Sequence, residues 1–473
     1  MKAMNSQTEI LDVALIGGGI MSTTLGTLIG AVLPNRSIAL FERLDHLAGE
    51  SSGPWKNAGT GHAGLCELNY MPDPEDPSRA EQIAGQFHVS RQFWSALPAL
   101  NSSFLNSSFL NETPHMNVVF GDTDIEYLRR RWSTMRTLPM FRAMEFTDDA
   151  DTVRQWAPLL MEGRSPQERV AATRHVGGTD IDFGALTESL GQSMEAAGCM
   201  VRTGHDITRV RRGSDGIWTL SGRIVDSRRR FHVRARFVFV GAGGYALRLL
   251  QKAGIPEIDG YGVFPFGAEF LRTDIADIVD RHDAKVYGKP SLGAPPMSLP
   301  HLDKRMVDGR GSLMFGPYAT FSTRLLTHGR LRDLFTTIRL RNLPVLLSVG
   351  LQNLPLVRYL VGQLLSSDAK KFEQLRQFYS AADPDDWYRI QAGQRAQLIK
   401  PTSKFRGELM FGTEIITGAG GSIAGLLGAS PGASVAPAAM IEVLERCFDS
   451  ERAEWEPRLR RLIPAASQPF STR

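Results

Sequence analysis

Short apolar runs and a glycine cluster give the amino-terminal part of the chain its most informative pattern. In residues 12–16, Asp12 precedes four aliphatic side chains, a run that is typical of a buried parallel strand. Three consecutive glycines at 17–19 follow it, and a second apolar run covers residues 37–41. This pattern predicts a strand, a glycine turn, a helix and a second strand, in that order.

The same region could be mistaken for a membrane span. Residues 13–33 are 21 positions without a formal charge, which is long enough to cross a bilayer. The glycine cluster interrupts this stretch, however, and the residues before it are not markedly basic. We therefore expect neither a transmembrane helix nor a signal peptide here.

The glycine turn matches the dinucleotide fingerprint G-x-G-x-x-G, with Ser22 in the third place. Gly17 would permit the tight turn, and Gly19 would let the backbone approach a pyrophosphate at a helix N-terminus. Glu42 follows the second strand, 25 positions after Gly17, where a carboxylate can accept the ribose hydroxyls of an adenosine. A glycine-rich turn in another α/β protein is the alternative, but strand, helix, strand and acid in this order favour a dinucleotide site.

The following stretches favour FAD over NAD. Residues 50–64 are rich in glycine and small polar side chains, so they can lay many backbone N–H groups along a long cofactor. A later apolar run at 237–240 leads into Gly241 and Gly243, which could return to the same sheet. No second well-formed fingerprint is present for a nicotinamide partner. The substrate itself would then supply the hydride.

Length, charge and cysteine content narrow the class further. A chain of 473 residues exceeds the size of a single growing core, so two domains are expected. Lys and Arg outnumber Asp and Glu by 54 to 50, which permits anionic partners. Two arginine runs, 129–131 and 228–230, lack interleaved aromatics or a known motif, so we expect no nucleic-acid binding. Three scattered cysteines form no metal set, and we expect no metal.

Several stretches together resemble the malate:quinone oxidoreductases, a family of FAD enzymes related to the D-amino-acid oxidase and 2-hydroxyglutarate dehydrogenase group. They are GGGIMS at 17–22, FERLD at 41–45, NAGTGHAG at 57–64, CELNY at 66–70, GAPPM at 293–297, PHLD at 300–303, FGPY at 315–318 and GASPGAS at 428–434. The resemblance covers nearly the whole chain. It departs from the family in small ways, such as Gly64 and Gly425.

This resemblance implies a mixed α/β fold. It combines a Rossmann-like, glutathione-reductase-type FAD domain with an inserted substrate domain built on an antiparallel sheet. The FAD domain would be assembled from residues 1–75, 175–260 and 385–450, and the substrate domain from 76–174 and 261–384. The tail, 457–473, is expected to be disordered.

The resemblance also implies an activity. The enzyme would oxidise (S)-malate to oxaloacetate by hydride transfer from C2 to flavin N5 and pass the electrons to a membrane quinone. It would work as a peripheral protein on the cytoplasmic side of the inner membrane. Another FAD-dependent 2-hydroxy-acid dehydrogenase, acting on 2-hydroxyglutarate, is the alternative, because one methylene in a pocket discriminates weakly.

The resemblance places the cofactor on a defined set of side chains and backbone groups. Gly432 belongs to the last glycine-rich segment, where amides at a helix start could face the flavin pyrimidine ring and stabilise its charge on reduction. The residues expected at the cofactor are Gly17, Gly19, Ser22, Glu42, Arg43, Asn57, Gly59, Thr60, Gly241, Gly243 and Gly432.

A dicarboxylate substrate needs an arginine and a proton acceptor. Arg395 follows an Ala-Gly-Gln sequence, a setting in which related hydroxy-acid dehydrogenases carry a substrate arginine, and its planar fork matches a carboxylate. His301 resembles the histidine of the corresponding strand in 2-hydroxyglutarate dehydrogenases and is expected to be the base. His62 is the other candidate, as a substrate or flavin contact. Weaker candidates for the second carboxylate are Tyr388, Arg389, Lys289 and Lys400.

Residues 334–367 contain no acidic side chain, yet they carry Arg339, Arg341 and Arg358 among apolar runs and two prolines. The segment is too broken to span a bilayer but could lie on an anionic lipid surface, with arginine stems reaching the headgroups. A pair of helices buried in the substrate domain is the alternative. A lipid-soluble quinone requires contact of this kind somewhere on the enzyme.

Overall fold

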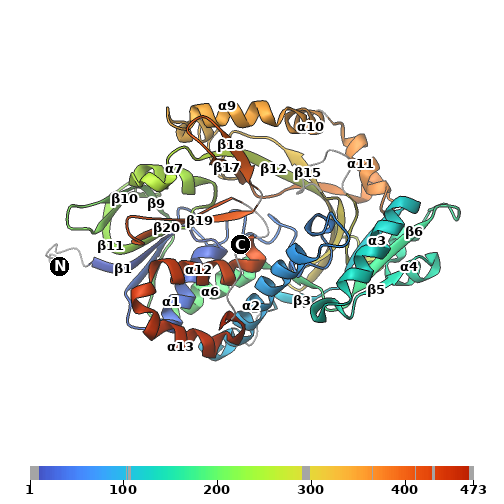
Figure 1. Ribbon diagram of the computed structural model, residues 1–473, viewed down its shortest axis with the longest axis horizontal. Coiled ribbons are helices and arrows are strands. Elements are labelled where there is room, and N and C mark those ends of the chain that lie inside the picture. The colour runs from blue at the N-terminus through green and yellow to red at the C-terminus, as the bar shows by residue number, and fades with distance from the viewer. Residues whose placement is uncertain are drawn as a thin grey trace.

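The computed structural model describes residues 10–102, 104, 108–289, 299–364, 366–410, 412–428 and 432–467. Two large sheets organise these residues, with helices on their outer faces (Figure 1). The motif at 293–297, and part of the motif at 428–434, lie outside the described residues.

The first sheet is mainly parallel and begins with the predicted strand–turn–helix–strand unit. Its path runs β19–β20–β11–β1–β2–β8, and β10 and β9 extend it from β11. The strands are β1 (Ile10–Ile16), β2 (Ile38–Phe41), β8 (Met200–Arg202), β9 (His205–Arg212), β10 (Trp218–Ile224), β11 (Arg230–Val240), β19 (Thr413–Gly418) and β20 (Ile423–Gly428). β1 lies between β2 and β11 and is parallel to both, as the apolar runs at 12–16, 37–41 and 237–240 predicted.

The second sheet is antiparallel except for one parallel pair, β13 with β4. Its path runs β18–β17–β12–β15–β14–β13–β4–β6–β5, and β16 pairs with β12. The strands are β4 (His115–Phe120), β5 (Glu145–Thr147), β6 (Val170–His175), β12 (Gly262–Thr273), β13 (Lys285–Tyr287), β14 (His301–Val307), β15 (Arg310–Thr320), β16 (Tyr388–Gln391), β17 (Arg395–Pro401) and β18 (Gly407–Met410). A short ribbon of β3 (Leu110–Glu112) and β7 (Thr179–Ile181) forms the third sheet.

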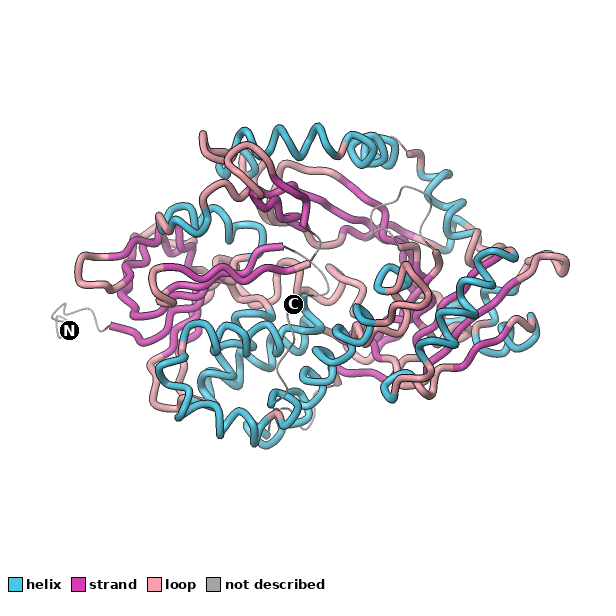
Figure 2. The backbone as a smooth tube through the Cα atoms, viewed as in Figure 1, coloured by secondary structure: helices cyan, strands magenta, loops and turns pink. Residues whose placement is uncertain are grey.

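Helices cover both sheets (Figure 2). They are α1 (Ile20–Val32), α2 (Ser78–Leu100), α3 (Asp122–Met135), α4 (Ala150–Trp156), α5 (Pro158–Met161), α6 (Phe183–Ala196), α7 (Ala246–Ala253), α8 (Ala276–Val279), α9 (Leu343–Gln352), α10 (Leu354–Leu364), α11 (Asp368–Arg376), α12 (Ala436–Cys447) and α13 (Arg452–Leu462). α1, α2, α6, α12 and α13 share one apolar core with the first sheet. Among the described residues, no helix is both long enough and apolar enough to cross a bilayer.

The fold class predicted from the sequence is confirmed, because a mainly parallel sheet with a glycine turn is joined to a large antiparallel sheet. The chain passes repeatedly between the two sheets. The proposed piece 385–450 starts with β16, β17 and β18, which pair in the second sheet rather than the first. The domain boundaries stay a prediction.

The predicted disordered tail is wrong over the part that the structure describes. α13 continues through Pro457 to Leu462, and a 3₁₀ helix covers Pro464–Ser467. Trp455 and Leu459 are buried in the core beside α1, so packing rather than local composition orders this segment. Residues 468–473 lie outside the described residues.

Candidate active site

A long cavity runs along the carboxyl ends of the parallel strands. At one end, Gly17 adopts a φ of 98°, and an added Cβ would lie 2.5 Å from the carbonyl oxygen of Gly241. This close approach exists because β1 and β11 end side by side. α1 begins at Ile20 after Gly19, and Gly19, Ile20 and Met21 line this end of the cavity. The amide of Ile20 donates to the Ser52 hydroxyl at 3.0 Å, and the helix N-terminus as a whole favours a phosphate.

Ser22 lies behind this turn and not on the cavity wall. An added Cβ on Gly241 would lie 2.2 Å from the Ser22 hydroxyl oxygen, so the two residues pack tightly against each other. A small residue at position 22 lets the helix approach the sheet, which is the packing role that the fingerprint assigns to its third position. Direct contact between Ser22 and a cofactor is not supported by this placement.

Glu42 and Arg43 line the cavity beside the glycine turn. The two carboxylate oxygens of Glu42 accept hydrogen bonds of 2.6 Å from the amides of Gly18 and Leu44. Arg43 contacts Glu50 at 3.2 Å and donates to the carbonyl of His328. Fixed in this way, the Glu42 carboxylate is oriented before any ribose arrives.

The loop after β2 forms the middle of the cavity wall. The side chain of Asn57 accepts a 2.9 Å hydrogen bond from the amide of Gly59. Gly59 has a φ of 63°, and an added Cβ would collide with the guanidinium of Arg305. Thr60 hydrogen-bonds with the hydroxyl of Tyr287 at 2.7 Å. The loop is therefore rigid, and it can tolerate only glycine at position 59.

His62 continues this loop and also lines the cavity. Its Nδ1 lies 3.0 Å from Oε1 of Glu67 and 3.4 Å from the hydroxyl of Tyr70. Burial raises the pKa of Glu67, but the charge of His62 and its hydrogen bond outweigh that effect and hold the pKa below its usual range. Glu67 is thus an ionised partner that keeps His62 in place.

Arg395 opens β17 and reaches the cavity wall next to Gln394. No described residue makes an ion pair or a side-chain hydrogen bond with its guanidinium. Burial lowers the pKa of Arg395, and the nearby Glu67 opposes the shift only in part. A desolvated cation that is open to a cavity and lacks a counter-charge is suited to bind an anionic ligand.

His301 lies deeper, on β14, and is not part of the wall of the long cavity. Its ring stacks on Tyr287, with centroids 4.5 Å apart and planes 13° from parallel. Nδ1 of His301 lies 2.8 Å from Oδ2 of Asp303. Each of the two predicted histidines therefore has its own carboxylate partner.

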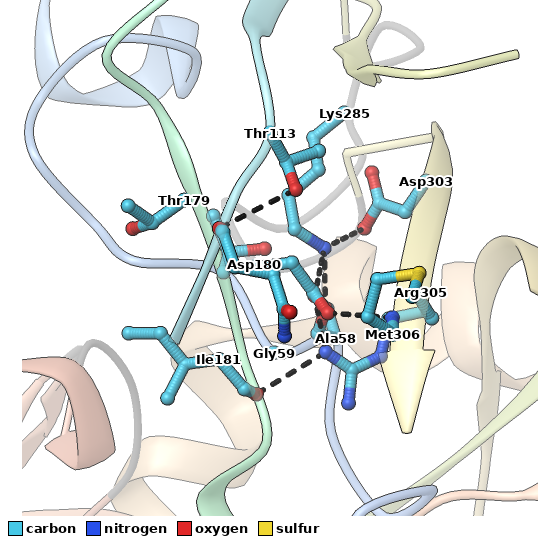
Figure 3. A network of polar contacts seen from close by, with 12 residues as sticks. Ala58, Gly59, Thr113, Thr179, Asp180, Ile181, Lys285, Asp303, Arg305 and Met306 are labelled. Atoms are coloured by element: carbon cyan, nitrogen blue, oxygen red, sulfur yellow. Dashed lines mark hydrogen bonds and ion pairs between the residues drawn. The ribbon is translucent and has the colours of Figure 1, made fainter. Parts of the chain in front are cut away.

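A buried charge network contacts the loop after β2 on the side away from the cavity. It consists of Asp180, Lys285, Asp303 and Arg305, all without exposed side-chain surface (Figure 3). The ammonium of Lys285 is 2.8 Å from Asp180, 3.5 Å from Asp303 and 2.8 Å from the carbonyl oxygen of Ala58. Arg305 pairs with Asp180 and donates to the carbonyl of Pro54 at 2.7 Å.

The sequence analysis missed this network. Its one local signal was the alternation of His301, Asp303 and Arg305 along β14, which places three polar side chains on the same face of a buried strand. Lys285 and Asp180 come from other strands, and their proximity depends on long-range pairing.

The weaker candidates for the second carboxylate do not line the long cavity. Lys289 pairs with Asp124, Arg389 with Asp368, and Lys400 with Glu414, while Tyr388 donates to Asp274. Each of these four side chains therefore has its polar partner outside the cavity. The structure does not bring these four residues to the cavity that Arg395 lines, and their role at the second carboxylate stays a prediction.

The remaining predicted glycines, Gly241, Gly243 and Gly432, also line the cavity. Gly241 and Gly243 follow β11, and Gly432 starts the 3₁₀ helix Gly432–Val435 that leads into α12. An elongated cavity with a helix N-terminus at one end, a carboxylate beside it and glycine-rich walls fits an extended FAD. Among the described residues, no cluster of His, Cys, Asp and Glu could hold a metal ion.

A separate feature lies at the periphery, where α9 and α10 form an outer helix pair along one edge of the molecule (Figure 1). Val345 and Val349 pack inward against Ile399 of β17. Large apolar side chains are exposed on the two helices and at five further positions: Leu343, Leu347, Leu351, Leu354, Val357, Val361 and Leu364 on the helices, and Phe321, Leu331, Phe335, Leu340 and Phe405 outside them. An exposed apolar surface of this extent marks an interaction site.

Two arginines of residues 334–367 already have partners within the chain. Arg341 pairs with Asp259, and Arg339 donates to the carbonyl oxygens of Thr336 and Ile338. Arg339, Arg341 and Arg358 all remain exposed. The segment is thus neither a pair of buried helices nor a purely electrostatic surface.

Comparisons with known proteins agree over the whole chain. A sequence model of the malate:quinone oxidoreductase (Mqo) family matches residues 9–473. A protein of Leifsonia xyli, named "Probable malate:quinone oxidoreductase", is 50% identical over 98% of this chain and 95% of its own length. One of Neisseria meningitidis with the same name is 47% identical over 96% and 94%.

Solved structures share the fold at low identity. L-α-glycerophosphate oxidase from Mycoplasma pneumoniae, solved with FAD bound, has a TM-score of 0.59 at 16% identity and covers 93% of this chain and 95% of its own. Glycine oxidase from Geobacillus kaustophilus has a TM-score of 0.58 at 15% identity, with the same coverage.

Proposed function

Because the chain belongs to the malate:quinone oxidoreductase family, we propose that it oxidises (S)-malate to oxaloacetate and passes the electrons to a membrane quinone. The match over residues 9–473 confirms the family predicted from the motifs, and with it an FAD-dependent oxidoreductase. The observation that carries the proposal is the unpaired, desolvated Arg395 on the cavity wall beside a histidine–carboxylate pair.

Arg395 would bind one carboxylate of malate. Arg395 is half-buried, and no described residue forms an ion pair with its guanidinium, so a bidentate carboxylate would restore the interactions lost with water. His62 lies on the same wall and would contact the substrate or the flavin, with its ring held by Glu67.

His301 would accept the hydroxyl proton of malate. The ring is fixed by Tyr287 and Asp303, and no described residue hydrogen-bonds with its Nε2. When bound, FAD supplies the acceptor for the hydride that leaves C2. Loss of the proton and the hydride together converts the secondary alcohol to the ketone.

Backbone groups and one carboxylate would hold the cofactor. Gly17 and Gly19 allow the pyrophosphate to approach the start of α1, and Glu42 accepts the ribose hydroxyls. The remaining cofactor contacts would come from Arg43, Asn57, Gly59, Thr60, Gly241, Gly243 and Gly432, which line the same cavity.

The outer helix pair would dock the enzyme on an anionic lipid surface, on the cytoplasmic side of the inner membrane. Its outward apolar side chains can enter the acyl boundary, and the exposed Arg339, Arg341 and Arg358 can reach the headgroups. A quinone dissolved in the same membrane would then need no passage through water.

A steady-state assay tests this function directly. The purified yellow protein is supplied with (S)-malate and either a soluble dye or a quinone, with and without NAD. Turnover with both acceptors, independent of NAD, is expected. Turnover that requires NAD, or a preference for 2-hydroxyglutarate over malate, would contradict the proposal.

A further inference from the structure

Asp303 occupies an unusual position between a histidine and a lysine. Its side chain has no exposed surface, and Oδ2 lies 2.8 Å from Nδ1 of His301 and 3.5 Å from Nζ of Lys285. Neither Nδ1 of His301 nor either carboxylate oxygen of Asp303 hydrogen-bonds with another described group. The short contact between the two side chains is therefore their main polar interaction.

The carboxylate is ionised in this environment. Burial raises the pKa of Asp303, but the charges of His301 and Lys285 outweigh burial and hold the pKa below its usual range. An ionised carboxylate beside Nδ1 favours a proton on that nitrogen, which leaves Nε2 unprotonated and able to accept a proton. Tyr287 fixes the ring plane, and Thr60 in turn fixes Tyr287.

Lys285 connects this pair to the cofactor loop. Its ammonium donates to the carbonyl of Ala58 and contacts Asp180 as well as Asp303. The two cations and two carboxylates of the buried charge network balance each other.

We propose that Asp303 is a positioning residue that sets the tautomer of His301. Lys285 contacts Asp303 and donates to the carbonyl of Ala58, so it holds this pair in place relative to the cofactor loop. The inference rests on the proposed function in one respect, the role of His301 as base. The groups that face His301 are Asp303 and Arg305 on its own strand, Lys285 and Tyr287 on β13, and Glu67 on the loop after His62.

The first measurement needs no turnover. Nitrogen NMR of the histidine-labelled holoprotein, with the His301 signal assigned by its loss in His301→Asn, reports tautomer and titration. We expect the wild-type ring to carry its proton on Nδ1. The isosteric Asp303→Asn should move that proton to Nε2, because the amide can donate to Nδ1. A wild-type proton on Nε2 would overturn the inference, even if Asp303→Asn failed to fold.

The second measurement is the rate of flavin reduction by malate across pH. Asp303→Asn should slow reduction by roughly 10²-fold or more. Asp308→Asn, an exposed carboxylate in the turn after the same strand, is the matched control and should leave the rate unchanged. An unaltered pH profile in Asp303→Asn would overturn the inference. If malate fails to reduce even the wild type, the proposed function is wrong, and the NMR result still decides the role of Asp303.

Discussion

The buried charge network and the outer helix pair both depart from the usual distribution of side chains, in which charged groups are exposed and apolar groups are buried. They differ in whether these side chains have partners within the chain. Asp180, Lys285, Asp303 and Arg305 are charged and lie inside, where each finds its partner within the chain. Leu340, Leu347 and Leu351 are apolar and lie outside, with exposed fractions of 92%, 61% and 71%. No described residue covers these three side chains.

This difference separates a preorganised site from an incomplete surface. Buried charges that satisfy one another cost no rearrangement when substrate arrives, so they can hold a catalytic group in place. Exposing leucine side chains to water is unfavourable, and burying them against an apolar partner lowers the free energy. Substitutions in the buried charge network should therefore change the rate of flavin reduction. Substitutions in the outer helix pair should change membrane binding.

The largest effect is expected at His301. His301→Asn removes the proton acceptor, so flavin reduction by malate should slow by roughly 10²–10⁴-fold while FAD stays bound. The acid limb of the pH profile should disappear. Rapid mixing measures this step without interference from the quinone. His62→Asn is the comparison: unchanged reduction in His301→Asn with loss in His62→Asn would transfer the role to His62.

A change of similar size is expected in membrane binding. Replacing Leu340, Leu347 and Leu351 with Gln removes about 1.5 kcal/mol of burial each, or roughly 10³-fold in vesicle affinity. Turnover with long-chain quinones should fall, and activity with a water-soluble dye should persist. Flotation with anionic vesicles checks the binding.

Two further variants sharpen this prediction. Replacing Val176, Val225 and Met200 with Gln changes three exposed apolar residues elsewhere and should have no effect on vesicle binding. Replacing Arg339, Arg341 and Arg358 with Glu should weaken binding by about 1 kcal/mol per charge, and salt should screen this part only. Vesicle binding that survives both the leucine and the arginine changes would place the docking surface elsewhere.

Arg395→Lys should have a smaller effect on the site. The charge is kept but the bidentate fork is lost, and one charged hydrogen bond of about 1.5–3 kcal/mol corresponds to a fall of roughly 10–150-fold in kcat/KM. Arg389→Lys, an exposed arginine paired with Asp368, is the matched control. A fall below about threefold in Arg395→Lys would place this arginine outside the site.

The smallest effect concerns acid stability. Burial lowers the pKa of both His115 and His282 from 6.5 to about 4. Between these values the unfolded chain binds more protons than the folded one, so stability should fall with decreasing pH by up to about 1.4 kcal/mol per pH unit for each histidine. His282→Gln should remove its share of that slope. Urea unfolding at several pH values tests this, and an equal slope in the variant would contradict it.

Sequence patterns brought Gly17 and Glu42 to the same cavity because their signals are local. A glycine turn must follow a strand directly, and the acid must end the next strand, so Gly17 and Glu42 could be assigned from spacing alone. Arg395 required the family resemblance. The Lys285–Asp180 contact could not be predicted, because it depends on how β7 packs beside the β13–β14 pair, more than a hundred residues later in the chain.

Two other outcomes depended on packing that composition does not encode. The charged segment around Trp455 looked like a tail, yet its few apolar side chains are buried beside α1. Residues 334–367 could be interpreted as core or as surface. In the structure α9 has both kinds of face, because Val345 and Val349 are buried while Leu347 and Leu351 are exposed. Local sequence gives the amphipathic character but not the direction in which each face points.

The most direct test of the account is a single-turnover experiment. The FAD-loaded protein is mixed anaerobically with (S)-malate, without quinone or NAD, and the flavin absorbance is followed. The account predicts rapid bleaching by (S)-malate, and bleaching by 2-hydroxyglutarate that is slower by about 10-fold or more, since one extra methylene discriminates by roughly that much. Flavin that stays oxidised with malate, or that 2-hydroxyglutarate reduces faster, would contradict it.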